Sequence, residues 1–199
     1  MKTKTKVIII IVLLVIILLF PVRYVYLDGG SKEYVSLLYK VIVWHRLDDF
    51  YDSGFKTGKE VHIFPNNFKS IDYYDEMDPH PSSLYLFYDE QMIKADIGSF
   101  KWCNKYNMCA YREVLLTDDM DYYKFFNVSK EDKIGYVFND GEISYIKLYK
   151  DTFSSRLGLD IKYDKEYIYA PRLTGKYVLN VIIKNGDSES NNYFGLNIK

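Results

Sequence analysis

Two cysteines are the clearest candidates for chemistry in this sequence. Cys103 and Cys109 enclose five residues, Asn-Lys-Tyr-Asn-Met. Across so short a loop a disulfide would clip the two ends of a hairpin, the pairing expected in an exported domain. A redox or metal-binding pair is the alternative, but such pairs favour the C-x-x-C spacing, and no histidine lies near either thiol in the sequence. We therefore expect a structural disulfide.

The three histidines do not form a recognisable zinc set. His45, His62 and His80 share neither an i,i+4 spacing nor an HExxH context. His45 could bind a cation together with Asp48 and Asp49 after folding, but only proximity in the sequence suggests this. We expect histidines on strand faces and predict no metal site and no cofactor.

Two acidic stretches, residues 72–78 and 118–121, have the oxygen ligands that calcium prefers. Neither matches the D-x-D-x-D-G loop, so solvated loops are the expected structures. A pair of carboxylates for glycoside hydrolysis can always be chosen among 27 acidic residues, and such a choice would be arbitrary. The sequence has no G-x-S-x-G, P-loop or G-x-G-x-x-G pattern, which removes the simplest enzyme classes.

Aromatic side chains are the remaining lead, since they make up 18% of the chain. Exposed rings can form a stacking platform for sugars or peptides, and the binding candidates are Tyr73, Tyr74, Trp102, Tyr122 and Tyr123. The pairs Tyr85/Phe87 and Phe100/Trp102 alternate along predicted strands, and this spacing favours an inward core face instead. Both interpretations stay open.

The amino-terminal segment should place these residues outside the cytoplasm. Residues 7–20 read VIIIIVLLVIILLF without a polar side chain, and Pro21 and Val22 follow. We predict a cytoplasmic tail over residues 1–6 and a transmembrane anchor over 7–23, extended if residues 24–27 continue it. Three lysines precede the run and only Arg23 closely follows it, which predicts an internal amino terminus and an extracellular carboxyl-terminal domain.

A cleaved secretory signal is the competing interpretation of this segment. Residues 20–27 contain no Ala, Ser or Gly for a cleavage site, so an uncleaved signal-anchor in the cell membrane is favoured. No cysteine follows the run, which argues against a lipid-modified amino terminus. Beyond residue 23 the chain has 22 basic and 27 acidic residues, and no basic block is long enough for nucleic-acid binding.

The exported part reads as mostly β. β-branched and aromatic residues predict strands that end at Gly, Asn, Asp or Pro. The predicted strands cover residues 34–44, 58–64, 84–88, 92–103 with a possible break at Gly98, 134–138, 142–149, 163–169, 177–184 and 192–198. A helix also fits 34–44, and 117–126 is expected to be one helical turn or a loop.

This spacing predicts an antiparallel sandwich after one transmembrane helix, and the resemblance described below implies that the sandwich is immunoglobulin-like. We expect a β-meander over residues 24–70, an acidic linker with two prolines over 71–83, and the sandwich over 84–199. Whether residues 24–199 form one compact unit or two stays open.

Three stretches carry a resemblance to known proteins: Leu27-Asp-Gly-Gly-Ser-Lys-Glu-Tyr leading to Trp44-His-Arg, Thr57-Gly58 leading to Ile63-Phe-Pro-Asn-Asn67, and Gly98-Ser-Phe-x-Trp-Cys103 with Cys109. The chain resembles small membrane-anchored or lipoprotein-type proteins of low-GC Gram-positive bacteria, most of unassigned function. The last two predicted strands resemble those that close bacterial immunoglobulin-like domains. The resemblance implies an extracytoplasmic sandwich and no active-site residues.

Together these features predict a membrane-tethered, non-catalytic β-domain that binds an envelope component or a partner protein. A cell-envelope hydrolase, with a site of scattered carboxylates and His45, is the alternative. A concave cleft holding two carboxylates or a His–carboxylate pair would favour the enzyme. A purely structural accessory subunit, the third possibility, would show a contiguous exposed apolar patch and no pocket.

Overall fold

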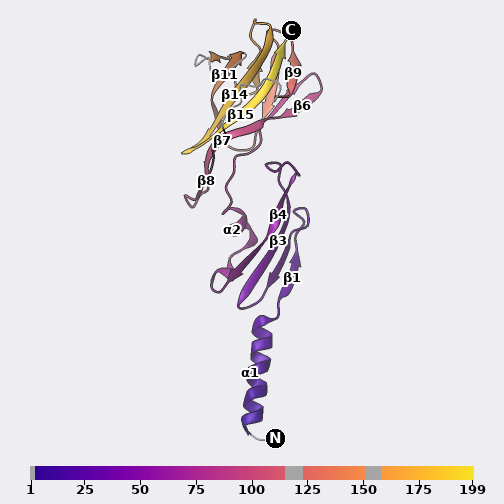
Figure 1. Cartoon of the computed structure of the whole chain (residues 1–199), viewed down its shortest axis with the longest axis vertical. Coiled ribbons are helices and arrows are strands. Elements are labelled where there is room, and N and C mark those ends of the chain that lie inside the picture. Colours follow the sequence, from indigo (N-terminus) through magenta and orange to yellow (C-terminus); the bar gives the residue numbers. More distant parts are fainter. Residues whose placement is uncertain (1–2, 115–122, 151–157) are drawn as a thin grey trace. The chain divides into compact units, whose positions relative to one another are not determined.

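The computed structural model describes residues 3–114, 123–150 and 158–199. The fold is mostly β with antiparallel sheets, and the chain divides into two compact units, Met1–Asp78 and Pro79–Lys199. Figure 1 shows the order of the elements along the chain. The division falls inside the segment 71–83 that the sequence analysis expects to be a linker.

The first unit begins with helix α1, Thr3–Leu19, which has 17 residues. Within the described residues, we find no helix that is both long enough and apolar enough to span a bilayer. After Phe20 and Pro21 the chain enters strand β1, Val22–Val25. The helix therefore ends before residue 23, where the anchor was predicted to end, and the possible extension through residues 24–27 is wrong, because Pro21 cannot continue the helix and β1 pairs with its neighbour instead.

A four-stranded antiparallel meander follows in the first unit. It contains β1, β2 (Lys32–Val35), β3 (Tyr39–Leu47) and β4 (Phe55–Ile63) in that order. The single strand predicted over 34–44 is broken, because the Ser36 hydroxyl accepts hydrogen bonds from the backbone N–H groups of Leu38 and Tyr39 and closes a turn.

One face of this meander is covered by the residues that follow it. A 3-10 turn, η1 (Asn66–Phe68), leads to helix α2 (Ile71–Asp75), whose N-cap is Ser70. Ile71 and Tyr74 of α2 pack with Ile42 and Trp44 of β3 to form a small core. The first residues of the expected acidic linker are therefore part of the first unit.

The second unit has two sheets. The smaller sheet has the order β13 (Tyr167–Tyr169), β10 (Lys133–Val137), β5 (Tyr85–Tyr88) and β6 (Gln91–Lys94). The larger has the order β12 (Leu159–Asp160), β11 (Glu142–Lys150), β14 (Gly175–Asn185), β15 (Ser188–Ile198), β7 (Asp96–Cys103) and β8 (Cys109–Arg112). Strand β9 (Phe125–Val128) joins β15 in parallel, the one parallel pairing among the described strands.

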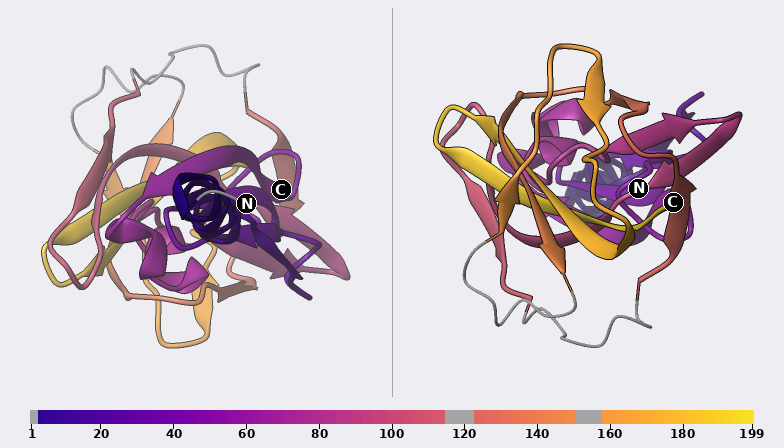
Figure 2. Two further views of the ribbon diagram at one scale, coloured as in Figure 1. Left: turned by 90° about the horizontal axis from the view of Figure 1, so that it is seen from below. Right: turned by 90° about the horizontal axis from the view of Figure 1, so that it is seen from above.

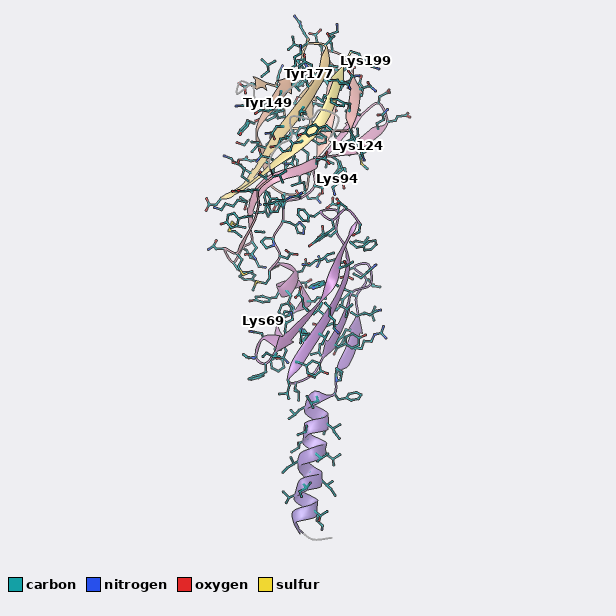
Figure 3. The ribbon with its side chains drawn as sticks, viewed as in Figure 1. Lys69, Lys94, Lys124, Tyr149, Tyr177 and Lys199 are labelled. Carbon is teal, nitrogen blue, oxygen red and sulfur yellow. A yellow bond between two sulfur atoms is a disulfide. The ribbon has the colours of Figure 1, made fainter. Side chains whose placement is uncertain are left out.

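The two sheets enclose a common hydrophobic core. Leu86, Ile134 and Ile168 come from the smaller sheet, and Leu179 and Phe194 from the larger. The two longest strands, β14 and β15, lie side by side, and their paired ribbons are yellow in the right panel of Figure 2. Tyr177, labelled in Figure 3, belongs to the same core. This packing fixes which side chains of the smaller sheet point outward.

The strand predicted over 92–103 is divided at a different place from the one expected. It breaks at Ala95, between β6 and β7, so its two halves lie in different sheets. Gly98 lies inside β7, where a Cβ atom would come within 2.2 Å of the Tyr193 ring. The glycine therefore marks a close approach between neighbouring strands and not a break.

Candidate functional site

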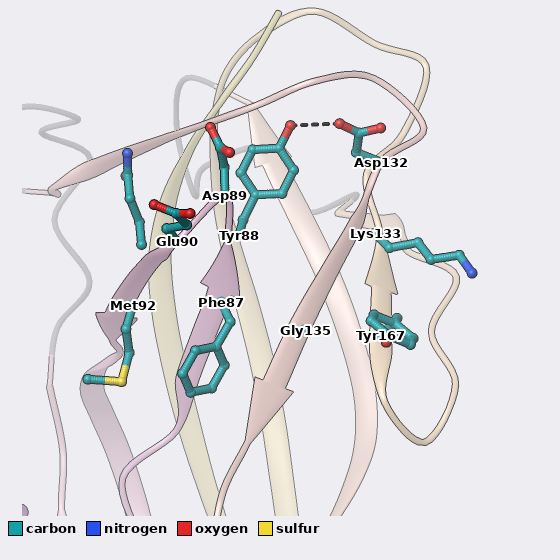
Figure 4. A pocket seen from close by; sticks show the side chains of 10 residues that line it. Phe87, Tyr88, Asp89, Glu90, Met92, Asp132, Lys133, Gly135 and Tyr167 are labelled. Carbon is teal, nitrogen blue, oxygen red and sulfur yellow. Dashed lines mark hydrogen bonds between the residues drawn. The ribbon is translucent and has the colours of Figure 1, made fainter.

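A groove of about 940 Å³ lies on the outer face of the smaller sheet. The residues lining it come from all four strands, from the β5–β6 turn and from the position just before β10: Phe87, Tyr88, Asp89, Glu90, Gln91, Met92, Asp132, Lys133, Gly135 and Tyr167. Figure 4 shows most of these side chains on one side of the sheet. They combine apolar surface with several carboxylates.

The floor of the groove is a row of residues across the sheet. Met92 is paired with Phe87, Phe87 with Gly135, and Gly135 with Tyr167. Because neighbouring strands are about 4.8 Å apart, Phe87 and Tyr167 are separated by about 9.6 Å at the backbone, with no side chain between them. The missing side chain of Gly135 therefore leaves a slot between two aromatic residues.

The backbone does not require glycine at position 135. Gly135 does not have a positive φ. A Cβ atom built there would lie 3.6 Å from the Cβ atom of Phe87 and 3.7 Å from its carbonyl oxygen, which is ordinary van der Waals contact. Glycine inside a strand usually weakens the strand. At position 135 the glycine leaves the slot between Phe87 and Tyr167 open.

The turn at one end of the groove has an unusual backbone. The pairing of Tyr88 with Gln91 leaves Asp89 and Glu90 as a two-residue loop, and their φ values are 49° and 63°. Such loops favour Asn-Gly, because left-handed backbone is costly for most residues. The two strained residues are also the two whose carboxylates line this end of the groove, and backbone strain of this kind tends to be kept at binding sites.

A third carboxylate is held in place by a tyrosine. The Tyr88 hydroxyl donates a hydrogen bond of 2.6 Å to Asp132, drawn as a dashed line in Figure 4, while its ring packs edge-on against Phe126 of the core. Lys133 follows Asp132, and its ammonium lies 5.3 Å from the centre of the Tyr167 ring. The groove lining therefore contains both hydrogen-bond acceptors and a cation.

Tyr167 is positioned by a loop that ends at its strand. Its backbone N–H donates to the carboxylate of Asp164 at 2.8 Å. Hydrogen bonds from Tyr169 and from the backbone of Glu166 and Tyr167 hold the pKa of Asp164 below its ordinary value. The same bond to Asp164 raises the pKa of Tyr169. The ionised carboxylate thus secures the turn that sets one wall of the slot.

The aromatic candidates from the sequence are not brought together. Tyr74, Trp102 and Tyr123 are 5–6% exposed and belong to three different apolar clusters. Tyr73 packs edge-on against Tyr74, with the Lys69 ammonium 5.0 Å from its ring. Rings buried this deeply cannot stack on a ligand unless a core opens. Tyr122 lies outside the described residues.

The interpretation of the pair Tyr85/Phe87 as an inward core face is wrong. The buried residues at the start of this strand are Leu84 and Leu86, so the alternate position turns outward and Phe87 is 40% exposed. The pair Phe100/Trp102 does face the core. The sequence analysis did not identify the groove residues Gly135, Tyr167, Asp89 and Glu90. One signal was available, because an Asp-Glu pair is unusual in a loop between two short strands, where Asn-Gly is preferred.

The cysteines and histidines have clear local roles. A disulfide joins Cys103 to Cys109 at the end of the β7–β8 hairpin. A ring nitrogen of His45 lies 2.7 Å from the carbonyl oxygen of Gly29. His62 contacts Glu60 at 3.0 Å and stacks on Tyr74, which links β4 to α2. A ring nitrogen of His80 lies 3.4 Å from the Pro81 carbonyl oxygen.

The acidic segment 72–78 makes ion pairs within the first unit. Asp75 pairs with Arg46 at 2.9 Å and with Lys56 at 3.4 Å, and Asp78 also pairs with Lys56. The described residues include no cluster of three or more His, Cys, Asp or Glu side chains suited to a metal ion. Residues 118–121 lie outside the described ranges.

Comparison with known proteins adds no relative. Neither a family model, nor a curated protein, nor a solved structure matches this chain.

Proposed function

We propose that this protein is a membrane-tethered, extracytoplasmic binding module that holds an envelope saccharide in the groove around Gly135. The second unit serves as an immunoglobulin-like sandwich whose smaller sheet presents the ligand surface, and α1 serves as the anchor. The resemblance to membrane-anchored proteins of Gram-positive bacteria supports the same placement. The observation that carries the proposal is the slot between Phe87 and Tyr167.

The dimensions of the slot favour a sugar ring as its occupant. The backbones of the two walls are about 9.6 Å apart and carbon atoms in contact are about 3.5–4.0 Å apart, so the slot has room for one ring and not for a stack of two. A pyranose has axial C–H groups on both faces of its ring. The apolar faces of the sugar can pack on Phe87 and Tyr167.

The polar groups around the slot suit the edge of the same ring. A pyranose has hydroxyl donors around its rim, and Asp89, Glu90 and Asp132 are acceptors in the lining. Lys133 and Gln91 add donors for ring or glycosidic oxygens. An apolar platform with a few convergent polar groups is the usual composition of a small-molecule site.

The first experiment is calorimetric titration of the full chain with N-acetylglucosamine and glucose oligosaccharides. Replacing Phe87 or Tyr167 with Ala should weaken binding at least tenfold, because each removes one wall of the slot. Val137→Ala is the matched control: Val137 is 45% exposed, compared with 40% for Phe87, and lies outside the groove lining. Equal affinities for all variants, or no binding by the unmodified chain, would refute the proposal.

The carboxylates of the groove favour a second candidate function, that of an envelope glycoside hydrolase. The groove has at least two acidic side chains, the feature that distinguishes the enzyme hypothesis. His45 is outside the groove lining, so the enzyme site would consist of Asp89, Glu90 and Asp132. Release of new reducing ends from a bound oligosaccharide, abolished by Asp132→Asn while binding persists, would identify the enzyme.

A further inference from the structure

One end of the first unit has an exposed apolar rim. Its members are large side chains that are 42–69% exposed: Leu37, Leu38, Ile63, Phe64 and Phe68. Phe64 and Phe68 pack edge-on against each other, with ring centres 5.9 Å apart. These residues come from the β2–β3 turn, the end of β4 and η1.

The strand pairing places this rim beside the entry point of the chain from α1. Val22, the first residue of β1, is paired with Val35, the last residue of β2. The next turn contains Leu37 and Leu38, and the backbone N–H of Phe64 donates to the Leu38 carbonyl at 2.9 Å. Leu19 ends the apolar helix, and three residue steps to Val22 reach at most about 11 Å.

Charge is distributed unevenly between the two ends of the sheet. The rim segments, residues 20–23, 35–40 and 62–69, contain no Asp or Glu. Their cations are Arg23, Lys69 and the buried Lys40, which is paired with Glu33. The turns at the opposite end contain four aspartates, Asp28, Asp48, Asp49 and Asp52. Lys69, labelled in Figure 3, follows η1 directly. An apolar and cationic end suits an anionic lipid surface, which would repel the acidic end.

Several backbone groups of the rim are satisfied within the unit. The Ser36 carbonyl accepts from the Asn67 side-chain amide at 2.9 Å. The Asn66 carbonyl accepts from the Tyr74 hydroxyl, and the Lys69 carbonyl from the Lys40 ammonium. Irregular backbone can enter a region poor in water only if its polar groups have internal partners. The rim loops fulfil much of this condition.

We propose that the rim is embedded in the headgroup region of the bilayer, so that the first unit is seated on the membrane surface. This inference relies on the membrane anchor of the proposed function. Side chains such as Phe and Leu enter about 5–10 Å into this region in interfacial proteins. The short link from Leu19 keeps the rim at the interface, and Arg23 and Lys69 face anionic headgroups.

Tryptophan quenching by brominated lipids tests this placement. The full chain is reconstituted into phosphatidylcholine–phosphatidylglycerol vesicles, with Phe64→Trp as the probe and Leu47→Trp as the matched control. Phe64 is 61% exposed and Leu47 is 64% exposed, but Leu47 ends β3 at the acidic end. After subtraction of the signal from Trp44 and Trp102, bromines near the headgroups should quench the Phe64→Trp signal at least twice as strongly.

The outcomes separate the two proposals. If the protein floats with the vesicles but quenching is equally weak at both positions, the proposal that the rim is embedded is wrong, while the proposed anchor still stands. Failure to float with the vesicles would overturn both the anchor and the embedding of the rim. Strong quenching confined to Phe64→Trp supports the embedded rim.

Discussion

At the scale of single residues, the β5–β6 turn joins backbone strain to the groove. Asp89 and Glu90 adopt left-handed conformations that Asn and Gly tolerate better. A sequence that leaves an unfavourable pair at a two-residue turn is locally inconsistent with its fold, which is the signature of a functional position. The side chains of both residues line the groove.

Replacing Asp89 and Glu90 should therefore have opposite effects on the stability of the fold and on the affinity for the ligand. We expect Asp89→Asn combined with Glu90→Gly to raise the free energy of unfolding by about 1 kcal/mol and to weaken saccharide binding, because strain and acceptors are removed together. Urea denaturation and calorimetry measure the two effects. Glu131→Gly is the control, since Glu131 has a φ of 61° and is not among the lining residues. It should add stability without changing affinity, and a less stable double variant would contradict the account.

Asp28 gives the first unit a dependence on pH. Burial raises the pKa of its carboxyl, but hydrogen bonds from Ser31 and Gly30 outweigh this effect and hold the pKa below its ordinary value of 3.8. A carboxylate with a lowered pKa stabilises the fold above the unfolded value, and that contribution is lost as the pH falls through the folded value.

Asp28→Asn should flatten this part of the acid response. The amide oxygen can still accept the turn hydrogen bonds but cannot titrate. We expect the variant to be less stable at pH 7 and to lose less stability than the unmodified chain as the pH falls below the ordinary carboxyl pKa of 3.8. Denaturant midpoints at a series of pH values measure this, and equal losses in both proteins would exclude the assigned role.

At the scale of elements, the β7–β8 hairpin is held by its disulfide. Cys103 and Cys109 are directly paired across the two strands. Closing so short a loop removes about 2 kcal/mol of freedom from the unfolded chain. The double variant Cys103→Ser, Cys109→Ser should lose about that much stability in urea denaturation. Reductant should weaken the unmodified chain equally and leave the variant unchanged, and an insensitive unmodified chain would refute this estimate.

The positions of most strands could be predicted, but their partners could not. Alternation and turn residues locate β5, β10, β11, β14 and β15 to within a few residues. The turn at Ser36 was missed because its signal is a side-chain hydrogen bond and not a glycine or proline. The break at Ala95 was missed because β6 and β7 join different sheets, which local sequence does not encode.

At the scale of the whole molecule, the groove depends on pairings between distant segments. Phe87, Gly135 and Tyr167 lie on three strands that are far apart in the sequence. The sequence pattern pointed to Phe87 but favoured a core position for it over a stacking platform, since alternation alone does not tell which face is inward. The disulfide was predictable because its two cysteines are only six residues apart.

The two functions that we propose belong to different units. The first unit has its own small core and its apolar rim, and the second has the larger core and the groove. In this account the first unit holds the protein at the membrane and the second binds a saccharide of the envelope. The central claim is that the empty position over Gly135 is the binding slot.

Calorimetric titration of Gly135→Leu with the oligosaccharide that binds most tightly to the unmodified chain tests this claim most directly. The leucine side chain should fill the slot and weaken binding at least tenfold, and the variant should still fold, because the backbone at 135 accepts a Cβ atom. Gly135→Ala should bind more tightly than Gly135→Leu. A folded Gly135→Leu protein with unchanged affinity would contradict the account.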